Sequence, residues 1–245
     1  MVTTPLSMTV SDAPSASNHE SSPVETRDAV DRHFLRRGHG AEFEMEAQWV
    51  RRNLPDGTDP ILDIGCGIGA LFPYIGQPRV IGVDHQATGL SLTQKRFPQS
   101  RLLCANASKV ALGDGVLAGI ALQHVLEHLP DAEACCREWQ RLLRPGGVLL
   151  LLTPNANFRD PRVFDDPTHV RLYHGASLLK LMNSTGFEVM SLRTIGLPWF
   201  QDYHSMPGGW RLRRLVLQHA EWLSTLPGFK RSGQTLCCVA RSPKS

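Results

Sequence analysis

Short runs of aliphatic residues alternate, from residue 60 onward, with stretches in which apolar side chains recur at helical spacing. Such runs are typical of strands buried on both faces, and the periodic stretches are typical of amphipathic helices. Strands are predicted at 61–64, 79–84, 101–104, 116–122, 148–152, 187–192 and 235–240, and helices at 88–97, 131–143 and 177–185. This alternation predicts an α/β fold, a doubly wound, Rossmann-like parallel sheet with helices on both faces.

The pattern also divides the chain into a tail, a domain and an insertion. Residues 1–24 are rich in Ser, Thr, Pro and Asn, so a disordered tail is predicted, with a partner-binding arm as the alternative. Residues 25–245 are predicted to form one domain, in which helices over 25–53 pack on the sheet edge and help to cover a cofactor site. The segment 196–234 is predicted to be a substrate lid between the last two strands. A helix packed on the domain, or one at a membrane interface, is the alternative.

Charge and composition limit the classes of partner. With 26 Lys and Arg against 23 Asp and Glu, the formal net charge of +3 is too close to balance for a nucleic-acid partner. The longest aliphatic run, 148–152, is far shorter than the roughly 20 residues that cross a bilayer. A secretion signal begins with basic residues, but the first Lys or Arg of this chain is Arg27. None of the six cysteines stands in a CxxC spacing, which predicts reduced thiols. We therefore expect a cytoplasmic protein without stable membrane insertion.

A glycine-rich turn follows the first predicted strand, in the sequence Asp63-Ile64-Gly65-Cys66-Gly67-Ile68-Gly69. Glycines permit a tight turn and let the backbone approach a ligand without a Cβ in the way. Ligands of open parallel sheets bind beyond the carboxyl ends of the strands, so Gly65, Cys66, Gly67 and Gly69 are predicted to bind a cofactor. The turn also fits the dinucleotide pattern G-x-G-x-x-G/A, with Ala70 in the last place, so a nicotinamide enzyme stays a rival.

Two carboxylates frame this turn. Asp63 lies immediately before the glycines, where it would repel a pyrophosphate and favour a cationic ligand without phosphate; its alternative role is to fix the turn by binding backbone amides. Asp84 ends the second predicted strand, where a carboxylate accepts hydrogen bonds from ribose hydroxyls, and the neighbouring His85 is predicted to join the same cofactor site. A nicotinamide dinucleotide and a cationic nucleoside without phosphate both contain a ribose, so Asp63 rather than Asp84 distinguishes between these two classes of cofactor.

An ordered set of motifs resembles the class I S-adenosylmethionine-dependent methyltransferase superfamily, in its small-molecule branch. The matching segments are ILDIGCGIG (61–69), VIGVD (80–84), HVLEHLPD (124–131), LLRPGGVLLLLTPN (142–155), DPTHVRLY (166–173) and STGFEV (184–189). The resemblance implies a seven-stranded sheet whose last strand is antiparallel, and S-adenosylmethionine as the cofactor. It also implies that the turn at 65–69 holds the methionine moiety while Asp84 holds the ribose.

The same resemblance extends to further cofactor-binding residues. Asn106 occupies the place where the family often has an acidic residue for the adenine amino group, and the backbone N–H of Ala107 would reach the ring. An amide oxygen accepts a hydrogen bond without the assistance of charge. Gln123 and His124, just past the fourth strand, are implied to lie near the methionine portion.

Three histidines are compared as sources of a general base, since a hydroxyl nucleophile must lose its proton and histidine titrates near neutral pH. His124 and His128 would share one face of a helix. His128 is a predicted catalytic residue, against the alternative that Glu127 and His128 cap a helix start. His169, in the connection after the fifth predicted strand, is a predicted substrate-side catalytic residue, against ordinary loop hydrogen bonding. No metal is predicted, because no further ligands accompany the aspartates before His169 at convincing spacing.

The leading hypothesis is an enzyme that transfers a methyl group from S-adenosylmethionine to a small-molecule substrate, with oxygen preferred as the acceptor. No Asn-Pro-Pro-Tyr motif follows the fourth strand, which disfavours the DNA-adenine and glutamine N-methyltransferase types. An NAD(P)-dependent oxidoreductase is the rival enzyme, although no Tyr-x-x-x-Lys spacing is present. A non-catalytic protein that binds the cofactor is the third hypothesis. The sequence does not indicate the oligomeric state.

Overall fold

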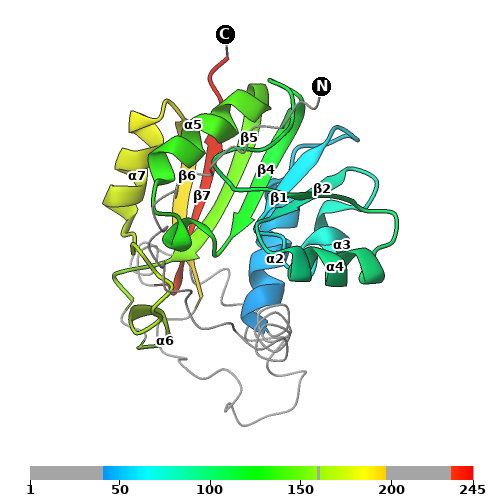
Figure 1. The fold of residues 1–245 in the computed structure, drawn as a ribbon. Helices are drawn as coiled ribbons and strands as arrows, with labels where there is room; N and C mark the ends of the chain where they lie inside the picture. The colour runs from blue at the N-terminus through cyan, green and yellow to red at the C-terminus, as the bar shows by residue number, and fades with distance from the viewer. Residues whose placement is uncertain (1–40, 159–160, 197–232, 245) are drawn as a thin grey trace, which may run out of the picture.

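A computed structural model of the chain describes residues 41–158, 161–196 and 233–244, and its centre is a seven-stranded sheet (Figure 1). The strands are β1 (Ile61–Ile64), β2 (Val80–Asp84), β3 (Arg101–Cys104), β4 (Leu117–Gln123), β5 (Leu143–Pro154), β6 (Glu188–Ile195) and β7 (Thr235–Arg241). They lie in the order β3-β2-β1-β4-β5-β7-β6. Each predicted strand is present at or near its predicted position, so the α/β class is confirmed.

The pairing of the strands creates a switch point at the centre of the sheet. Strands β1 to β5 pair in parallel, whereas β7 is antiparallel to both β5 and β6, as the family resemblance implies. The chain runs outward from β1 to β3 and then returns to β4 on the other side of β1. Ligands of open α/β sheets bind at such a reversal, beyond the carboxyl ends of the strands.

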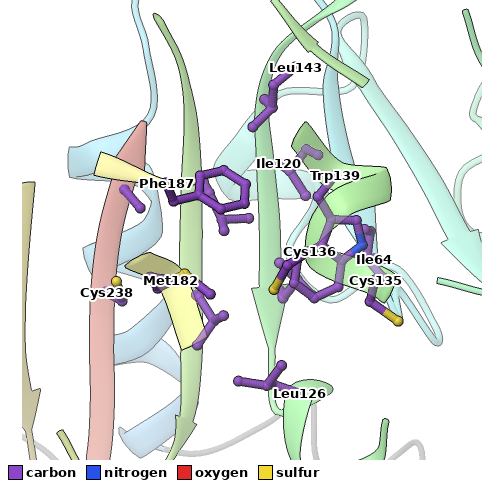
Figure 2. Packing of buried hydrophobic residues seen from close by; sticks show 14 of the residues in the cluster. Ile64, Ile120, Leu126, Cys135, Cys136, Trp139, Leu143, Met182, Phe187 and Cys238 are labelled. Carbon is purple, nitrogen blue, oxygen red and sulfur yellow. The ribbon is translucent and has the colours of Figure 1, made fainter. Parts of the chain in front are cut away.

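Helices cover both faces of this sheet (Figure 1). On one face α2 (Ala41–Asn53), α3 (Phe72–Ile75) and α4 (Ala87–Arg96) contribute to one apolar cluster, and on the other α5 (Ala132–Leu142) and α7 (Gly175–Ser184) contribute to a second. Figure 2 shows Trp139 of α5, Met182 of α7 and Cys238 of β7 in the second cluster. The sheet is therefore apolar on both faces, and polar side chains near its centre gather at the strand ends.

Two details differ from the sequence expectation. Helix α2 packs on a face of the sheet rather than on its edge, because the buried Trp49 and Val50 join the cluster that contains Ile61 and Leu150. Strand β5 begins at Leu143, so the segment 145–147, which was expected to separate helix from strand, lies inside the strand. The helix before it ends at Leu142, one residue earlier than predicted, because the backbone of Leu143 is already extended.

Several sequence predictions fall outside the described residues. These are the disordered tail at 1–24, the helical segment at 25–40 and nearly all of the predicted lid at 196–234, of which residues 197–232 are not described. Within the described ranges, no helix has the length and the apolar character that a membrane span requires. The tail and the lid stay predictions.

Candidate active site

The glycine turn after β1 is fixed by hydrogen bonds to β2 and α4. Gly65, Gly67 and Gly69 all have positive φ, at 68°, 50° and 70°. The N–H of Gly67 donates to Oδ2 of Asp84 at 2.9 Å, and Oγ1 of Thr93 donates to the carbonyl of Gly67 at 2.6 Å. The turn is thus tied to the strand whose last residue, Asp84, is predicted to bind the ribose.

A Cβ at Gly65 would meet protein rather than open space. It would lie 2.3 Å from Cγ2 of Val125, in the segment that follows β4. A Cβ at Gly69 would lie 2.9 Å from Cγ2 of Thr93. Glycine is therefore required at these positions both for the backbone conformation and for the close approach of α4 and the β4 connection.

Asp84 orients the turn, and both of its oxygens accept hydrogen bonds. Oδ2 accepts from Gly67, and Oδ1 accepts from the N–H of Gln86 at 2.8 Å. Each carboxylate oxygen has a second lone pair, so a bond from a ribose hydroxyl is compatible with this arrangement. His85 is exposed, with Nδ1 3.5 Å from Oδ1 of Asp84. The contacts of both side chains with a cofactor stay predictions.

Asp63 is a buried carboxyl group in the middle strand of the site. Its exposed fraction is 2%, and among the described residues no group donates a hydrogen bond to its carboxylate. Burial and the neighbouring charge of Asp84 raise the pKa of Asp63 well above its ordinary value. Burial likewise raises the pKa of the Cys66 thiol, so Cys66 is a neutral side chain that lines the turn. The alternative that Asp63 fixes the turn through backbone amides is not what the structure shows, because Asp84 has that role.

Asn106 uses its amide oxygen within its own loop. Oδ1 accepts from the N–H of Ser108 at 3.0 Å and from its hydroxyl at 2.9 Å. The carbonyl of the neighbouring Ala107 accepts from Nε1 of Trp139 at 2.9 Å. These bonds fix the loop after β3 on α5, and they leave the amide NH₂ of Asn106 and the N–H of Ala107 as the groups to test for adenine contacts.

A glutamate that the sequence analysis missed, Glu46 of α2, organises the end of β4. It is buried and accepts from Nε2 of Gln123 at 2.7 Å and from Oγ1 of Thr235 at 2.6 Å, and Nε2 of His124 lies 3.0 Å from its Oε2. Burial acts to raise the pKa of Glu46, but these interactions outweigh it and lower the pKa. One signal was available in the sequence: Glu46 lies at helical spacing from the apolar Phe43, Trp49 and Val50, where a charged side chain needs a partner.

His124 is held between two buried glutamates. Its Nε2 contacts Glu46 and its Nδ1 lies 3.5 Å from Oε1 of Glu127. Burial alone would lower the pKa of His124, but Glu46 and Glu127 raise it to about 10. His124 is also the one residue other than glycine with positive φ, 53°, in the described ranges. The interactions of Gln123 and His124 direct both side chains toward α2, and their role in holding the methionine portion stays a prediction.

The expectation that His124 and His128 share a helical face is wrong. A 3₁₀ helix, η1 (Leu126–His128), begins only after His124, and the positive φ of His124 breaks the helical path between the two histidines. The start of η1 has no side-chain cap, so the capping alternative for Glu127 and His128 is not supported.

His128 lies beside His169 instead. The backbone N–H groups of Val170 and Arg171 donate to the carbonyl of Glu127 at 2.9 and 3.2 Å, which holds the loop after β5 against η1. The two imidazole rings then lie with their centroids 4.8 Å apart. The structure therefore brings both predicted catalytic histidines into one cluster.

Each of these histidines is oriented by a backbone carbonyl. Nδ1 of His128 lies 3.0 Å from the carbonyl of Thr168, and Nδ1 of His169 lies 2.7 Å from the carbonyl of Val163. A carbonyl only accepts hydrogen bonds, so Nδ1 is the protonated nitrogen of each ring. In the neutral form Nε2 then carries the lone pair that can take a proton or a metal ion.

Comparison with known proteins identifies the central part of the chain. Residues 62–151 match the family described as "Methyltransferase domain". Over 135 residues the chain is 33% identical to a Mycolicibacterium smegmatis protein named "Probable S-adenosylmethionine-dependent methyltransferase". The aligned region covers 53% of this chain and 52% of that protein. Over 127 residues it is 29% identical to the "Ubiquinone biosynthesis O-methyltransferase" of Aromatoleum aromaticum. This aligned region covers 47% of this chain and 52% of that protein. The matched region thus spans about half the length of each of these two relatives.

A solved structure shares the whole architecture. The crystal structure of a SAM-dependent methyltransferase from Archaeoglobus fulgidus superposes with a TM-score of 0.58 at 22% identity, over 85% of this chain and 99% of that one. At this identity the likeness concerns the fold alone. It confirms the Rossmann-like sheet with its antiparallel last strand.

Proposed function

We propose that this chain, whose residues 62–151 form a methyltransferase domain of the class I S-adenosylmethionine-dependent superfamily, transfers a methyl group from S-adenosylmethionine to a small-molecule acceptor. The domain match confirms the resemblance found in the sequence. The observation that carries the proposal for this chain is the buried carboxylate of Asp63 beside the glycine turn.

The carboxylates suit a cationic cofactor. Asp63 is buried without a hydrogen-bond donor among the described residues and lies close enough to Asp84 for its pKa to be raised. The ammonium group of S-adenosylmethionine would supply the missing donor through a charge-assisted hydrogen bond. A pyrophosphate at the same turn would add negative charge beside two carboxylates, which disfavours a nicotinamide dinucleotide.

The remaining cofactor contacts are proposed at the residues that the sequence predicted, with the amide NH₂ of Asn106 in place of its oxygen, which bonds Ser108. The turn Gly65, Cys66, Gly67 and Gly69 would enclose the methionine portion together with Gln123 and His124. Asp84 and His85 would bind the ribose, and Asn106 and Ala107 would bind the adenine. The ends of β1, β2, β3 and β4 bring these groups to one edge of the sheet.

The cofactor supplies an activated methyl group, so the chain has mainly to position the acceptor in line with it and to exclude water. We propose an oxygen nucleophile, with His128 or His169 accepting its proton at Nε2. The orientation of both rings by backbone carbonyls supports this role, as does the similarity to an O-methyltransferase over about half of each chain.

Two measurements test the proposal. Calorimetry with S-adenosylmethionine and with NADH or NADPH should show binding of the first and none of the others. Labelled cofactor should then transfer its methyl group to a member of a panel of phenols, sugars and carboxylates, and the H128A or H169A variant should lower kcat without lowering cofactor affinity. Binding without turnover on any acceptor would favour the non-catalytic hypothesis, and binding of the dinucleotide alone would overturn the proposal.

A cytoplasmic location remains part of the proposal. Its support is that all six cysteines are free thiols, five of them buried and only Cys104 exposed. Detection of the tagged full-length protein in a cytosolic fraction checks it.

A further inference from the structure

Three side chains near the carboxyl ends of β4 and β5 offer a set of metal ligands. Glu127 and His128 lie on η1 and His169 lies on the loop after β5, and one ligand atom from each lies within 4.8 Å of the others. A site of two imidazoles and a carboxylate favours a first-row divalent transition metal over Mg²⁺. We propose that Glu127, His128 and His169 bind one such ion.

The orientation of the two histidines is the arrangement found around metal-binding imidazoles. A metal-binding histidine commonly donates its other ring N–H to a backbone carbonyl or carboxylate, which fixes the tautomer. Nδ1 of His128 and Nδ1 of His169 each donate to a backbone carbonyl, of Thr168 and Val163. Nε2 is therefore the ligand atom on both rings.

The carboxylate is also oriented by a hydrogen bond. Oε2 of Glu127 accepts from Oγ1 of Thr153 at 3.0 Å, and its Oε1 lies 3.9 Å from Nε2 of His128. His124 lies between Glu127 and Glu46, and His128 is the second imidazole beside Glu127. Oε1 of Glu127 thus faces the ring of one of the two histidines that complete the proposed ligand set.

The distances require only a small adjustment. Bonds of about 2.0–2.2 Å to nitrogen and oxygen place two ligands of one ion roughly 3–4 Å apart. The present span of 4.8 Å must therefore shorten by about an ångström. His128 and His169 lie on a single 3₁₀ turn and on a loop, and small side-chain rotations there can supply this shift.

The inference deepens the proposed function, on which it relies for the role of the ion but not for its binding. An ion held by three protein ligands keeps positions open for a substrate oxygen. The cluster lies on the connections that follow β4 and β5, at the edge of the sheet where the cofactor is proposed to bind. With the ion bound, both Nε2 atoms would be ligands instead of bases. The ion would then lower the pKa of a bound acceptor hydroxyl, whose proton would pass to water.

The test is metal binding by the full chain after treatment with a chelator, without cofactor. Calorimetry and the visible absorption of Co²⁺ should show one equivalent of Zn²⁺ or Co²⁺ bound, and Mg²⁺ should bind at least about 10-fold more weakly. H128A and H169A should each weaken Co²⁺ binding more than about 10-fold, as loss of even an orienting group does. Glu127→Gln keeps the shape of the side chain and should show the same loss of Co²⁺ binding. It replaces the alanine variants in the test if either of them fails to fold.

Cys104→Ser is the matched control, because Cys104 is an exposed thiol outside the cluster and should leave Co²⁺ binding unchanged. The absence of stoichiometric binding would overturn the inference, as would equal binding by wild type, H128A and H169A. If the protein binds the metal but transfers no methyl group, the proposed function is wrong and the inferred metal site stands. If the protein treated with chelator does not bind Co²⁺ but still transfers methyl groups, the inferred metal site is wrong and the proposed function stands.

Discussion

At the scale of single residues, burial of Asp63 lowers the stability of the folded protein near neutral pH, and its proposed contact with the cofactor would offset this cost. Its pKa is raised by burial and by Asp84, so the folded state keeps the proton over a pH range in which the unfolded state has already released it. Stability therefore falls as pH rises from the ordinary aspartate pKa, about 3.9, through the raised value. We expect D63N to unfold at higher denaturant concentration than wild type near neutral pH, with the difference shrinking toward about pH 4.

The same variant should lose cofactor affinity. A hydrogen bond to a charged group contributes about 1.5–3 kcal/mol, so D63N should bind S-adenosylmethionine about 10- to 100-fold more weakly in calorimetry. Asp56→Asn, at an exposed position before β1, is the control and should change neither property. A D63N protein that binds as tightly as wild type would remove Asp63 from the site.

Gly65 is expected to be required by the fold before any cofactor binds. The G65A variant would combine a positive φ of 68° with a Cβ 2.3 Å from Val125. Conformational strain of about 1–2 kcal/mol and overpacking of about 1–3 kcal/mol should together lower the free energy of unfolding by roughly 2–5 kcal/mol in urea titrations. Gly57→Ala has a positive φ of 96° with no atom within 4 Å of the new Cβ, so it isolates the strain. Equal losses in the two variants would show that the contact with Val125 contributes nothing.

At the scale of elements, Glu46 joins α2 to the ends of β4 and β7. The E46Q variant keeps the size of the side chain but removes the charge that faces His124 at 3.0 Å and accepts from Thr235. Because Glu127 still faces the other side of His124, we expect a loss of about 1–3 kcal/mol rather than the larger cost of an unpaired buried charge. Hydrogen exchange should show faster exchange of the α2 amides, ahead of the amides of β4.

Glu44 on the same helix provides the comparison. It is exposed and bonds Gln48 and Tyr74 at the surface, so E44Q should change stability by no more than about 0.5 kcal/mol. If E46Q and E44Q were equally stable, the contacts of Glu46 would have no part in holding α2.

At the scale of the whole molecule, the sheet was predictable because its strands are aliphatic on both faces. The runs 61–64 and 101–104 match β1 and β3 at both ends, since turn or loop residues bound them. The start of β5 was not predictable from hydrophobicity, because residues 144–147 form a register shift between Leu143, which pairs with Leu117, and Val148, which pairs with Gly119. The antiparallel last strand came from the family resemblance, not from periodicity.

The candidate site was predictable where it is local and not where it depends on contacts between distant segments. The glycine turn, Asp63 and Asp84 lie at strand ends that the sequence marks directly. Glu46 contacts Thr235 across 189 positions, and the loop that contains His169 is held to η1 by backbone hydrogen bonds that no side-chain pattern reveals. His124 and His128 were assigned to one face because the spacing suits a helix, whereas a positive φ separates them.

Cofactor binding should stabilise the whole fold, because the groups proposed to bind it lie at the ends of four strands and come together only in the folded state. A ligand that binds the folded state alone, at 100 times its Kd, adds about 2.7 kcal/mol to the free energy of unfolding. For a domain of this size that corresponds to a rise in Tm of about 5–10 °C. Thermal denaturation should show this rise with S-adenosylmethionine and less than about 1 °C with NADH at the same concentration. In D63N, with its affinity about 10- to 100-fold lower, the rise at that concentration should shrink to about 1–6 °C. A larger rise with the dinucleotide than with S-adenosylmethionine would mean that the two carboxylates do not exclude a pyrophosphate.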